Sequence, residues 1–363
     1  MAALAGVNIL WISGQGQDGV SALIAGPIAQ LLSGFGHRLT YWPLGPERPY
    51  HPTEFGERFD GPSGQGWSGP VQVMGAIRRH ATRYDLLVVE QDLAWDFRTL
   101  EAVLGLARRP PVWLLATLPL SYYLASRGEH HVARTRRLAE KLLGRFDRIL
   151  TLAAAVARDL VQHFGVPEAR ATTVLWPAPA APAASPQFGS EVAVAGSITG
   201  IKGVDVLVDV LARLRQEGLA ATLRVFGDGP ERPEMEAEAE REGVPLQREP
   251  LTPALTERLA TSSVFCGPQW LDGTAWDYVT AAAAGLPLTG VSAPEAPAEI
   301  LLGGTLGRLA GLGETDRLAD LLRGLLTDRR IWAGYHEASR LLANRHRAPA
   351  MTSGWEAILP PSS

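Results

Sequence analysis

Short apolar runs alternate with longer helical patterns along the chain, and this alternation is the feature that most constrains its fold. In the first half, strands are expected at about 7–12, 38–42, 86–89, 112–116, 148–152 and 172–175. Helices are expected between most of them, at about 20–33, 71–82, 127–146 and 154–164. Such β-α alternation predicts a parallel sheet covered by helices on both faces.

The alternation is interrupted once and then restarts. The stretch from Trp176 to Ser190 is rich in Pro, Ala and Ser and lacks any period, so it predicts an interdomain linker. Strands are then expected at 191–195, 221–226, 245–248, 264–266 and 287–291. Helices are expected at 203–217, 231–242, 253–261, 276–284 and 315–326. The pattern predicts two doubly wound α/β domains, at 1–176 and 191–328, joined by a linker at 177–190.

The end of the chain, 329–363, predicts helices that pack back on the N-terminal domain.

A formal net charge of −4 gives no reason to expect nucleic acid as a partner. The segment from Arg127 to Arg148 is locally basic. It can be interpreted as a solvated helix face, or as a surface that contacts a membrane peripherally. No apolar segment is long enough for a transmembrane helix, and the apolar start lacks the basic region of a signal peptide, so a cytoplasmic protein is expected.

The first strand is followed by Gly14, Gly16 and Gly19, which match the spacing of a dinucleotide-binding loop. A nicotinamide or flavin site also expects an acid at the end of the second strand, to hold the ribose. The stretch 37–45 contains none, and Asp18 would put a negative charge beside the pyrophosphate. The glycines therefore predict either a loop whose backbone comes close to some other ligand, or only a tight turn without a ligand.

The second half carries a more specific pattern. A strand ends before "GSITGIKG", the next strand ends in "FGDG", and "LDGTAWDYVTAAAAGLPLTG" and "PAEI" follow in order. In order and spacing, these motifs resemble the retaining glycosyltransferases of the GT-B fold, and within them the family 4-like enzymes (glycosyl transferases group 1). The resemblance covers nearly the whole chain. It implies two Rossmann-like domains that face a cleft, a metal-independent hexosyltransferase and no cofactor besides a nucleotide-diphosphate sugar donor.

The resemblance assigns roles to residues that match the family motifs. Lys202, followed by Gly203, stands where a lysine neutralises the donor diphosphate, and Ser197 stands at the position of the paired arginine. Asp272 stands at the first glutamate of the family, beside the transferred sugar, and Thr280 at the second, which holds the ribose. The other implied donor-site positions are Gly227, Gly229, Gly273, Thr274, Ala275 and Glu299.

The expected catalytic residues are thus Asp272 and Lys202. The chain contains only two lysines, Lys141 and Lys202, among 34 basic residues, which favours a specific role for the second. Lys202 could instead be a solvated lysine at a helix start, and Asp272 an N-cap residue. Thr280 could bond its own helix backbone.

The N-terminal domain would bind the acceptor: a saccharide, a lipid-linked sugar or a small molecule. Expected acceptor-side positions are Gly16, Asp18 and Gly19; weaker candidates are Glu90, Asp92, Trp95, Tyr122 and Tyr123. The family usually has a histidine near the sugar at the end of the fourth strand of this domain, and here Ala116 or Thr117 stands there. The sequence leaves two alternatives open. One is a non-catalytic GT-B subunit. The other is a nicotinamide oxidoreductase, although the acid expected for it at the end of the second strand is missing.

Overall fold

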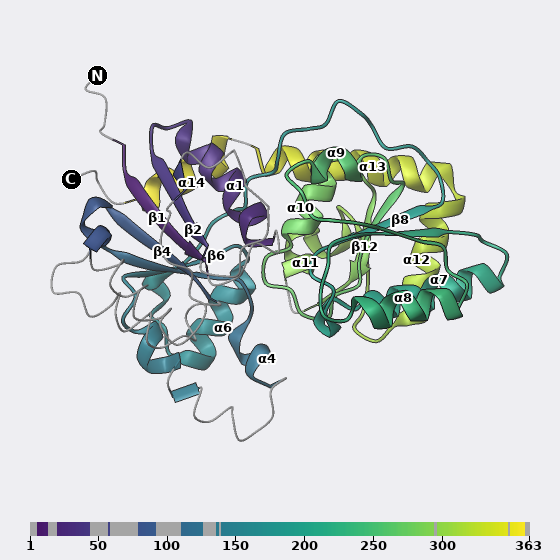
Figure 1. Cartoon of the computed structure of the whole chain (residues 1–363), viewed down its shortest axis with the longest axis horizontal. Coiled ribbons are helices and arrows are strands. Elements are labelled where there is room, and N and C mark those ends of the chain that lie inside the picture. Colours follow the sequence, from purple (N-terminus) through teal and green to yellow (C-terminus); the bar gives the residue numbers. More distant parts are fainter. Residues whose placement is uncertain are drawn as a thin grey trace. The chain divides into compact units, whose positions relative to one another are not determined.

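The computed structural model describes residues 6–13, 20–43, 57–58, 79–91, 110–125, 136–137, 139–293, 296–347 and 349–359. The chain forms two compact units, both drawn in Figure 1. The first comprises Met1–Pro177 and Pro349–Ser363, and the second comprises Ala178–Ala348. Each unit contains its own parallel sheet, so we describe the two separately.

The first unit is built on a seven-stranded sheet of order β3-β2-β1-β4-β5-β6-β7, in which every neighbouring pair is parallel. The strands are β1 (Asn8–Ser13), β2 (Arg38–Pro43), β3 (Glu57–Arg58), β4 (Leu86–Glu90), β5 (Val112–Ala116), β6 (Arg148–Thr151) and β7 (Ala171–Thr173). Strands β4 and β5 are buried along their whole length, as expected for a parallel sheet covered on both faces.

The first unit also contains α1 (Val20–Ser33), α4 (Leu120–Ala125), α6 (Ala154–Phe164) and α14 (Pro349–Ile358). The predicted helices at 20–33 and 154–164 are confirmed, whereas those predicted at 71–82 and 127–146 lie largely outside the described residues. Tryptophan side chains anchor the end of this unit. The Trp355 indole donates to Leu175 O at 2.9 Å, and the Trp176 indole donates to Ile24 O at 2.9 Å.

The second unit is built on a six-stranded parallel sheet of order β10-β9-β8-β11-β12-β13. The strands are β8 (Glu191–Ala195), β9 (Thr222–Phe226), β10 (Leu246–Glu249), β11 (Val264–Gly267), β12 (Leu288–Val291) and β13 (Arg308–Ala310). The helices are α7 (Val204–Gln216), α8 (Arg232–Arg241), α9 (Leu255–Leu259), α10 (Trp276–Ala283), α11 (Ala296–Ile300), α12 (Thr315–Thr327) and α13 (Arg329–Arg345).

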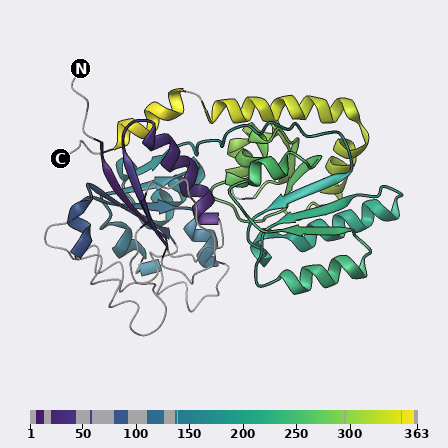
Figure 2. The same cartoon turned by 45° about the horizontal axis from the view of Figure 1, so that its top comes forward.

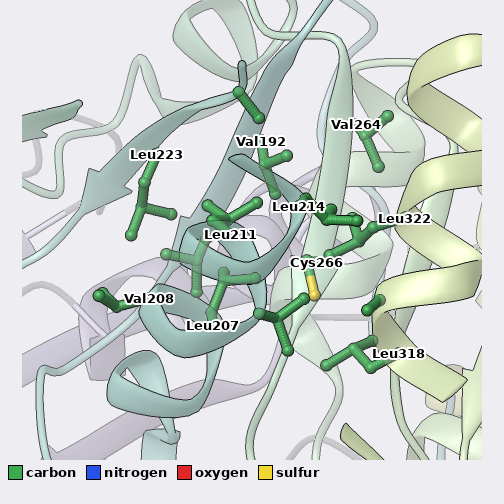
Figure 3. Packing of buried hydrophobic residues seen from close by; sticks show 14 of the residues in the cluster. Val192, Leu207, Val208, Leu211, Leu214, Leu223, Val264, Cys266, Leu318 and Leu322 are labelled. Atoms are coloured by element: carbon green, nitrogen blue, oxygen red, sulfur yellow. The ribbon is translucent and has the colours of Figure 1, made fainter. Parts of the chain in front are cut away.

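The core of the second unit lies where α7 and α12 pack on the sheet. Figure 3 shows Leu207 and Leu211 of α7 close to Val192 of β8, and Leu318 and Leu322 of α12 on the side of Cys266. All of these side chains are almost completely buried. Helix α10 packs against β11 and β12, and α13 packs on α10 (Figure 2). Helices therefore cover this sheet on both sides, as its continuous apolar strands require.

The stretch expected to be a linker is part of the second unit from Ala178 onward. It forms no helix or strand, but Phe188 packs edge-on against Trp332, with ring centroids 6.2 Å apart. An aromatic side chain buries apolar area on the nearest core, and this holds the stretch on its own unit.

The C-terminal helices do not share one unit. Helix α13 packs against α10 and α12 in the second unit, and only α14 belongs to the first. The expectation that both would pack on the N-terminal domain is therefore corrected for α13, whose residues Trp332 and Leu342 are buried. None of the described helices is both long and apolar enough to cross a bilayer.

Both sheets have a point where the strand order reverses direction. The reversal lies between β1 and β4 in the first unit and between β8 and β11 in the second. In open α/β sheets, loops at the carboxyl ends of the strands diverge at this point and leave a crevice where ligands bind. The two reversal points are therefore the places to look for chemistry.

Candidate functional site: the reversal point of the second sheet

The loop after β8 is fixed to the loop after β11. Gly203 adopts a left-handed conformation (φ 67°), and an added Cβ would come within 2.7 Å of Pro268 O. Nearby, Trp270 N donates to Ile201 O at 3.2 Å. Only glycine combines this backbone angle with so close an approach, so Gly203 helps to join the two loops.

These loops hold Lys202 over the carboxyl ends of β8 and β11. Lys202 ends a single helical turn at Gly200–Lys202, and its side chain folds over Gly196. An added Cβ at Gly196 would lie 3.1 Å from Lys202 Nζ. The ammonium donates to Asp277 Oδ2 at 2.5 Å, and the two side chains are 12% and 1% exposed. The sequence-predicted lysine therefore lies at the reversal point, in a nearly buried ion pair.

Asp277 is the site residue that the sequence analysis missed. It lies in the first turn of α10, where a carboxylate also interacts favourably with the helix dipole. Burial raises its pKa and the neighbouring Asp272 adds to this, while the Lys202 ammonium acts in the opposite direction. The available signal for Asp277 was an acidic residue in the first turn of the helix expected in this motif. Such a residue is equally typical of an ordinary helix start, so the sequence alone did not indicate a role in the site.

Asp272 organises the turn that leads into α10. Its Oδ1 accepts hydrogen bonds from the backbone amides of Thr274 and Ala275, both at 2.9 Å. Its Oδ2 accepts from Gln269 Nε2 at 2.8 Å. The carboxylate thus already has partners on both oxygens. It orders the turn before α10, whereas the N-cap residue of this helix is Ala275 and not Asp272.

Gln269 connects the two aspartates. Its Nε2 also lies 3.3 Å from Asp277 Oδ2, and its own Oε1 is buried without a hydrogen-bond partner among the described residues. A buried polar atom without a partner is uncommon and is often found where a ligand or water completes the contact. Gln269 was not selected from the sequence, because nothing in its local pattern distinguishes it from a loop residue.

The remaining donor-site candidates of this segment mostly bond within their own element. Thr280 Oγ1 donates to Trp276 O at 2.8 Å, which is the helix back-bond considered from the sequence. Ala275 adopts a left-handed conformation (φ 46°), which is strained for any residue with a Cβ. Gly273 is buried next to it. The amides of Thr274 and Ala275 donate to Asp272, so they are not free to face a phosphate in this state.

Gly227 and Gly229 pack the loop after β9 against the loop after β8. An added Cβ would come within 1.9 Å of Gly196 O at Gly227 and within 2.1 Å of Ile198 O at Gly229. The backbone of the loop after β8 therefore occupies the space that a side chain at Gly227 or Gly229 would need. Ser197, at the arginine position, is half-buried between these contacts.

Glu299 lies in the short helix α11 and is half-buried. The helix start is connected to the site because Ala296 N lies 3.4 Å from Asp272 O. The structure thus brings the segments of Lys202, Asp272 and Glu299 to the carboxyl edge of one sheet.

On the acceptor side, Gly16, Asp18 and Gly19 lie outside the described residues, as do Asp92 and Trp95. Glu90 ends β4 at the reversal point of the first sheet and is 3% exposed. Its Oε1 accepts from the Trp11 indole at 2.7 Å, and its Oε2 accepts from Ser13 Oγ at 2.8 Å.

The second-unit site combines one ammonium, two buried carboxylates and a helix start. Within the described part of the chain, no three His, Cys, Asp or Glu side chains gather in a group suited to a metal. An ammonium and a helix N-terminus can stabilise negative charge that develops on a bound group, as a departing phosphate requires.

Comparisons with known proteins show what the chain is similar to. Residues 189–328 match a family model described as "Glycosyl transferases group 1". A curated exopolysaccharide phosphotransferase of Streptomyces coelicolor is 29% identical over 161 residues, which cover 43% of this chain and 17% of that protein. The match thus spans less than a fifth of the curated relative.

Solved structures share the whole fold. HepE of Anabaena, in complex with UDP-glucose, has a TM-score of 0.76 and 16% identity, over 97% of this chain and 99% of that chain. WaaG, a glycosyltransferase involved in lipopolysaccharide biosynthesis, has a TM-score of 0.72 and 16% identity, over 98% and 100%. TarM of S. aureus has a TM-score of 0.67 and 12% identity, over 80% of this chain and 58% of that chain. The predicted fold class, GT-B, is confirmed.

Proposed function

We propose that this chain, whose second unit carries the glycosyl transferases group 1 domain, transfers a sugar from a nucleotide-diphosphate sugar to an acceptor hydroxyl. We further propose that transfer retains the anomeric configuration and requires neither a metal nor a cofactor. The observation that carries the proposal is the position of the Lys202 ammonium, at the reversal point of the sheet in the unit that matches the family.

The chemistry follows from what a diphosphate leaving group requires. Negative charge grows on the departing phosphate as the bond to the sugar breaks, and a nearly buried ammonium stabilises it more than an exposed one could. The start of α10 adds the positive end of its dipole. In this proposal Asp277 acts as a positioning residue, which keeps Lys202 over the strand ends until the diphosphate arrives.

Retention means that the acceptor attacks from the face that the diphosphate leaves. The departing phosphate then takes the acceptor proton, so a separate base is not needed. Glycoside hydrolysis offers a contrast, since it uses two carboxylates on either side of the bond. Asp272 and Asp277 both lie beside Gln269 and have hydrogen-bond partners, which does not suit that scheme.

We assign Asp272 a place beside the transferred sugar, where it also orders the turn before α10. Thr280 Oγ1 donates its hydrogen to Trp276 O and keeps its lone pairs, one of which can accept a hydrogen bond from a ribose hydroxyl. Glu299 is proposed to complete the sugar pocket. We assign the acceptor to the first unit, with Gly16, Asp18 and Gly19 as its proposed contacts.

UDP-glucose is the first donor to test, because HepE was solved in complex with it. Titration calorimetry with UDP should give binding to the wild type and a loss of roughly tenfold or more in Lys202→Gln. Lys141→Gln is the matched control, because it removes the other lysine, which is exposed in the first unit. Equal losses in both variants, or undiminished binding in Lys202→Gln, would contradict the proposal.

Turnover is tested separately by the release of UDP from UDP-glucose with and without candidate saccharide acceptors. Activity unchanged by EDTA supports metal independence, and proton NMR of the first-formed product reports its anomeric configuration. Binding of several nucleoside diphosphates without release from any matching donor would instead favour a non-catalytic GT-B subunit.

A further inference from the structure

A second cavity in the same unit lies away from the reversal point and has a distinct chemistry. It has a volume of about 430 Å³, within the range of small-molecule sites. We call it the α13 cavity. It is lined by Ala181, Pro182, Ala184, Ser185, Pro186, Ala282, Ala283, Ala284, Gly285, His336, Arg340, Ala343, Asn344 and Arg347.

The lining is basic although the chain as a whole is acidic. Two arginines and one histidine line the α13 cavity, and no Asp or Glu does, while the formal net charge of the chain is −4. A smaller cavity of the same unit has the opposite character, since four acids and no basic residue line it. The positive charge of the α13 cavity is therefore local, and it does not follow from the charge of the chain as a whole.

Arg347 is the main observation. Its guanidinium is half-buried and donates to Pro179 O, at 3.1 Å from Nε. Among the described residues it has no carboxylate partner, and burial lowers its pKa because no nearby negative charge offsets the loss of water. A partly desolvated cation without a counter-ion gains most when an anion binds beside it.

Two neighbouring polar side chains, Arg340 and His336, also line the cavity. Among the described residues, Arg340 pairs only with Glu337, three residues earlier. Both side chains are more than 60% exposed, so this ion pair is weak and can rearrange. The His336 ring stacks on Trp332 with centroids 5.2 Å apart. Its Nδ1 lies 2.6 Å from Gly285 O, a carbonyl that can only accept, so Nδ1 carries the hydrogen.

The carboxyl end of α10 also borders the cavity, and its carbonyls would repel an anion if they were free. Most of them have partners. Ala281 O accepts from Leu286 N, and Ala282 O accepts from Gly285 N. Gly285 O accepts from His336, and Leu286 O from Ser339 Oγ at 2.5 Å. The repulsion that this helix end presents is thereby reduced.

We propose that the α13 cavity binds a small phosphate-bearing ligand, up to the size of a sugar phosphate, through Arg340 and Arg347. Arginine forks bind phosphate oxygens in pairs, and the apolar Ala and Pro walls suit the body of a compact organic ligand. This site is separate from the donor site, because its residues come from α13 and the turn after it, the carboxyl end of α10 and the segment 178–190.

The position of the cavity gives binding a structural consequence. The chain passes between the two units at Pro177–Ala178 and again at Ala348–Pro349. On the second unit these connections are linked, because Ala178 N donates to His346 O at 3.0 Å and Arg347 donates to Pro179 O. A ligand on Arg347 would therefore bind to a side chain that joins the two connections on the second unit.

The test uses pyrophosphate and glucose 1-phosphate in a Lys202→Gln background, so that the donor site does not contribute. Calorimetry should detect binding of at least one probe at millimolar concentration. Arg340→Gln and Arg347→Lys should each weaken it by roughly tenfold, since each loses a charged or paired contact. Arg345→Gln is the matched control, an exposed arginine of α13 that does not line the cavity.

A second readout keeps the test independent of folding and of activity. Hydrogen exchange should show that the bound probe protects the segments 178–190 and 336–347. No binding of either probe, or equal losses in Arg340→Gln and Arg345→Gln, overturns the proposal. Protection confined to the segment around Lys202 and the first turn of α10 in the wild type also overturns it.

Discussion

The two sheets reverse their strand order in the same way, yet different charged groups lie at the two reversal points. In the first unit, Glu90 lies there, and both of its oxygens accept hydrogen bonds from buried neighbours of β1. In the second unit, Lys202 lies there in a pair with Asp277. The units share this topology, but the acid described at the first reversal point bonds within its own unit, whereas an ammonium lies at the second. In the function proposed above, this ammonium and not the strand order marks the second unit as the donor unit.

The largest effect should come from breaking the ion pair on one side. Lys202→Met leaves the Asp277 carboxylate buried without its partner, which typically destabilises a protein by about 3 kcal/mol or more. Chemical denaturation followed by hydrogen exchange should assign the loss to the second unit. The double variant Lys202→Met/Asp277→Asn should recover most of it. A double variant as unstable as the single one would show that the pair is not the cause.

The matching change in the first unit should have a smaller effect. Glu90→Gln keeps the shape of the side chain but leaves one of two buried donors, Trp11 or Ser13, opposite an amide NH₂, at a cost of about 1–3 kcal/mol. The exchange signal should lie in the first unit, and UDP affinity should stay within about twofold. Loss of UDP binding as severe as that in Lys202→Gln would contradict the division of roles between the units.

The pH dependence of stability provides a third comparison. Burial raises the pKa of Asp277, so between its ordinary value near 4 and its raised value the folded chain keeps a proton that the unfolded chain has released. Its contribution to stability is therefore present at low pH and declines as pH rises through that window. Asp277→Asn should remove this decline. The check is the difference in unfolding free energy between wild type and variant, measured from about pH 4 to pH 8; a constant difference would contradict it.

The sequence predicted best what depends on local pattern. The strands at 112–116 and 191–195 have the predicted bounds, and the predicted helix start at Trp276 is confirmed, because apolar runs and turn residues are local signals. Short elements at sheet edges, such as β13 at Arg308–Ala310, gave too little pattern to be predicted. The same holds for α4, which has only six residues.

The site was predictable only in part. Lys202 and Asp272 were identified from motif order, but the partner of Lys202 lies 75 residues away in the sequence, and the contact between Glu90 and Trp11 spans 79. Pairing of this kind depends on the reversal of strand order, which no local pattern encodes. The tight packing of Gly227 and Gly229 against the loop after β8 likewise depends on the tertiary structure.

The smallest effect concerns the backbone beside the ion pair, at Ala275. Its left-handed conformation (φ 46°) costs about 1–2 kcal/mol for a residue with a Cβ, and glycine removes this cost but adds roughly 0.4–1 kcal/mol of entropy to the unfolded chain. Ala275→Gly should therefore stabilise the second unit by about 0.5–1 kcal/mol. Ala281→Gly, in the regular part of α10, is the matched control and should destabilise by about 1 kcal/mol. If both glycines destabilised alike, the turn at Ala275 would carry no strain, and its shape would owe nothing to the two hydrogen bonds that Asp272 accepts there.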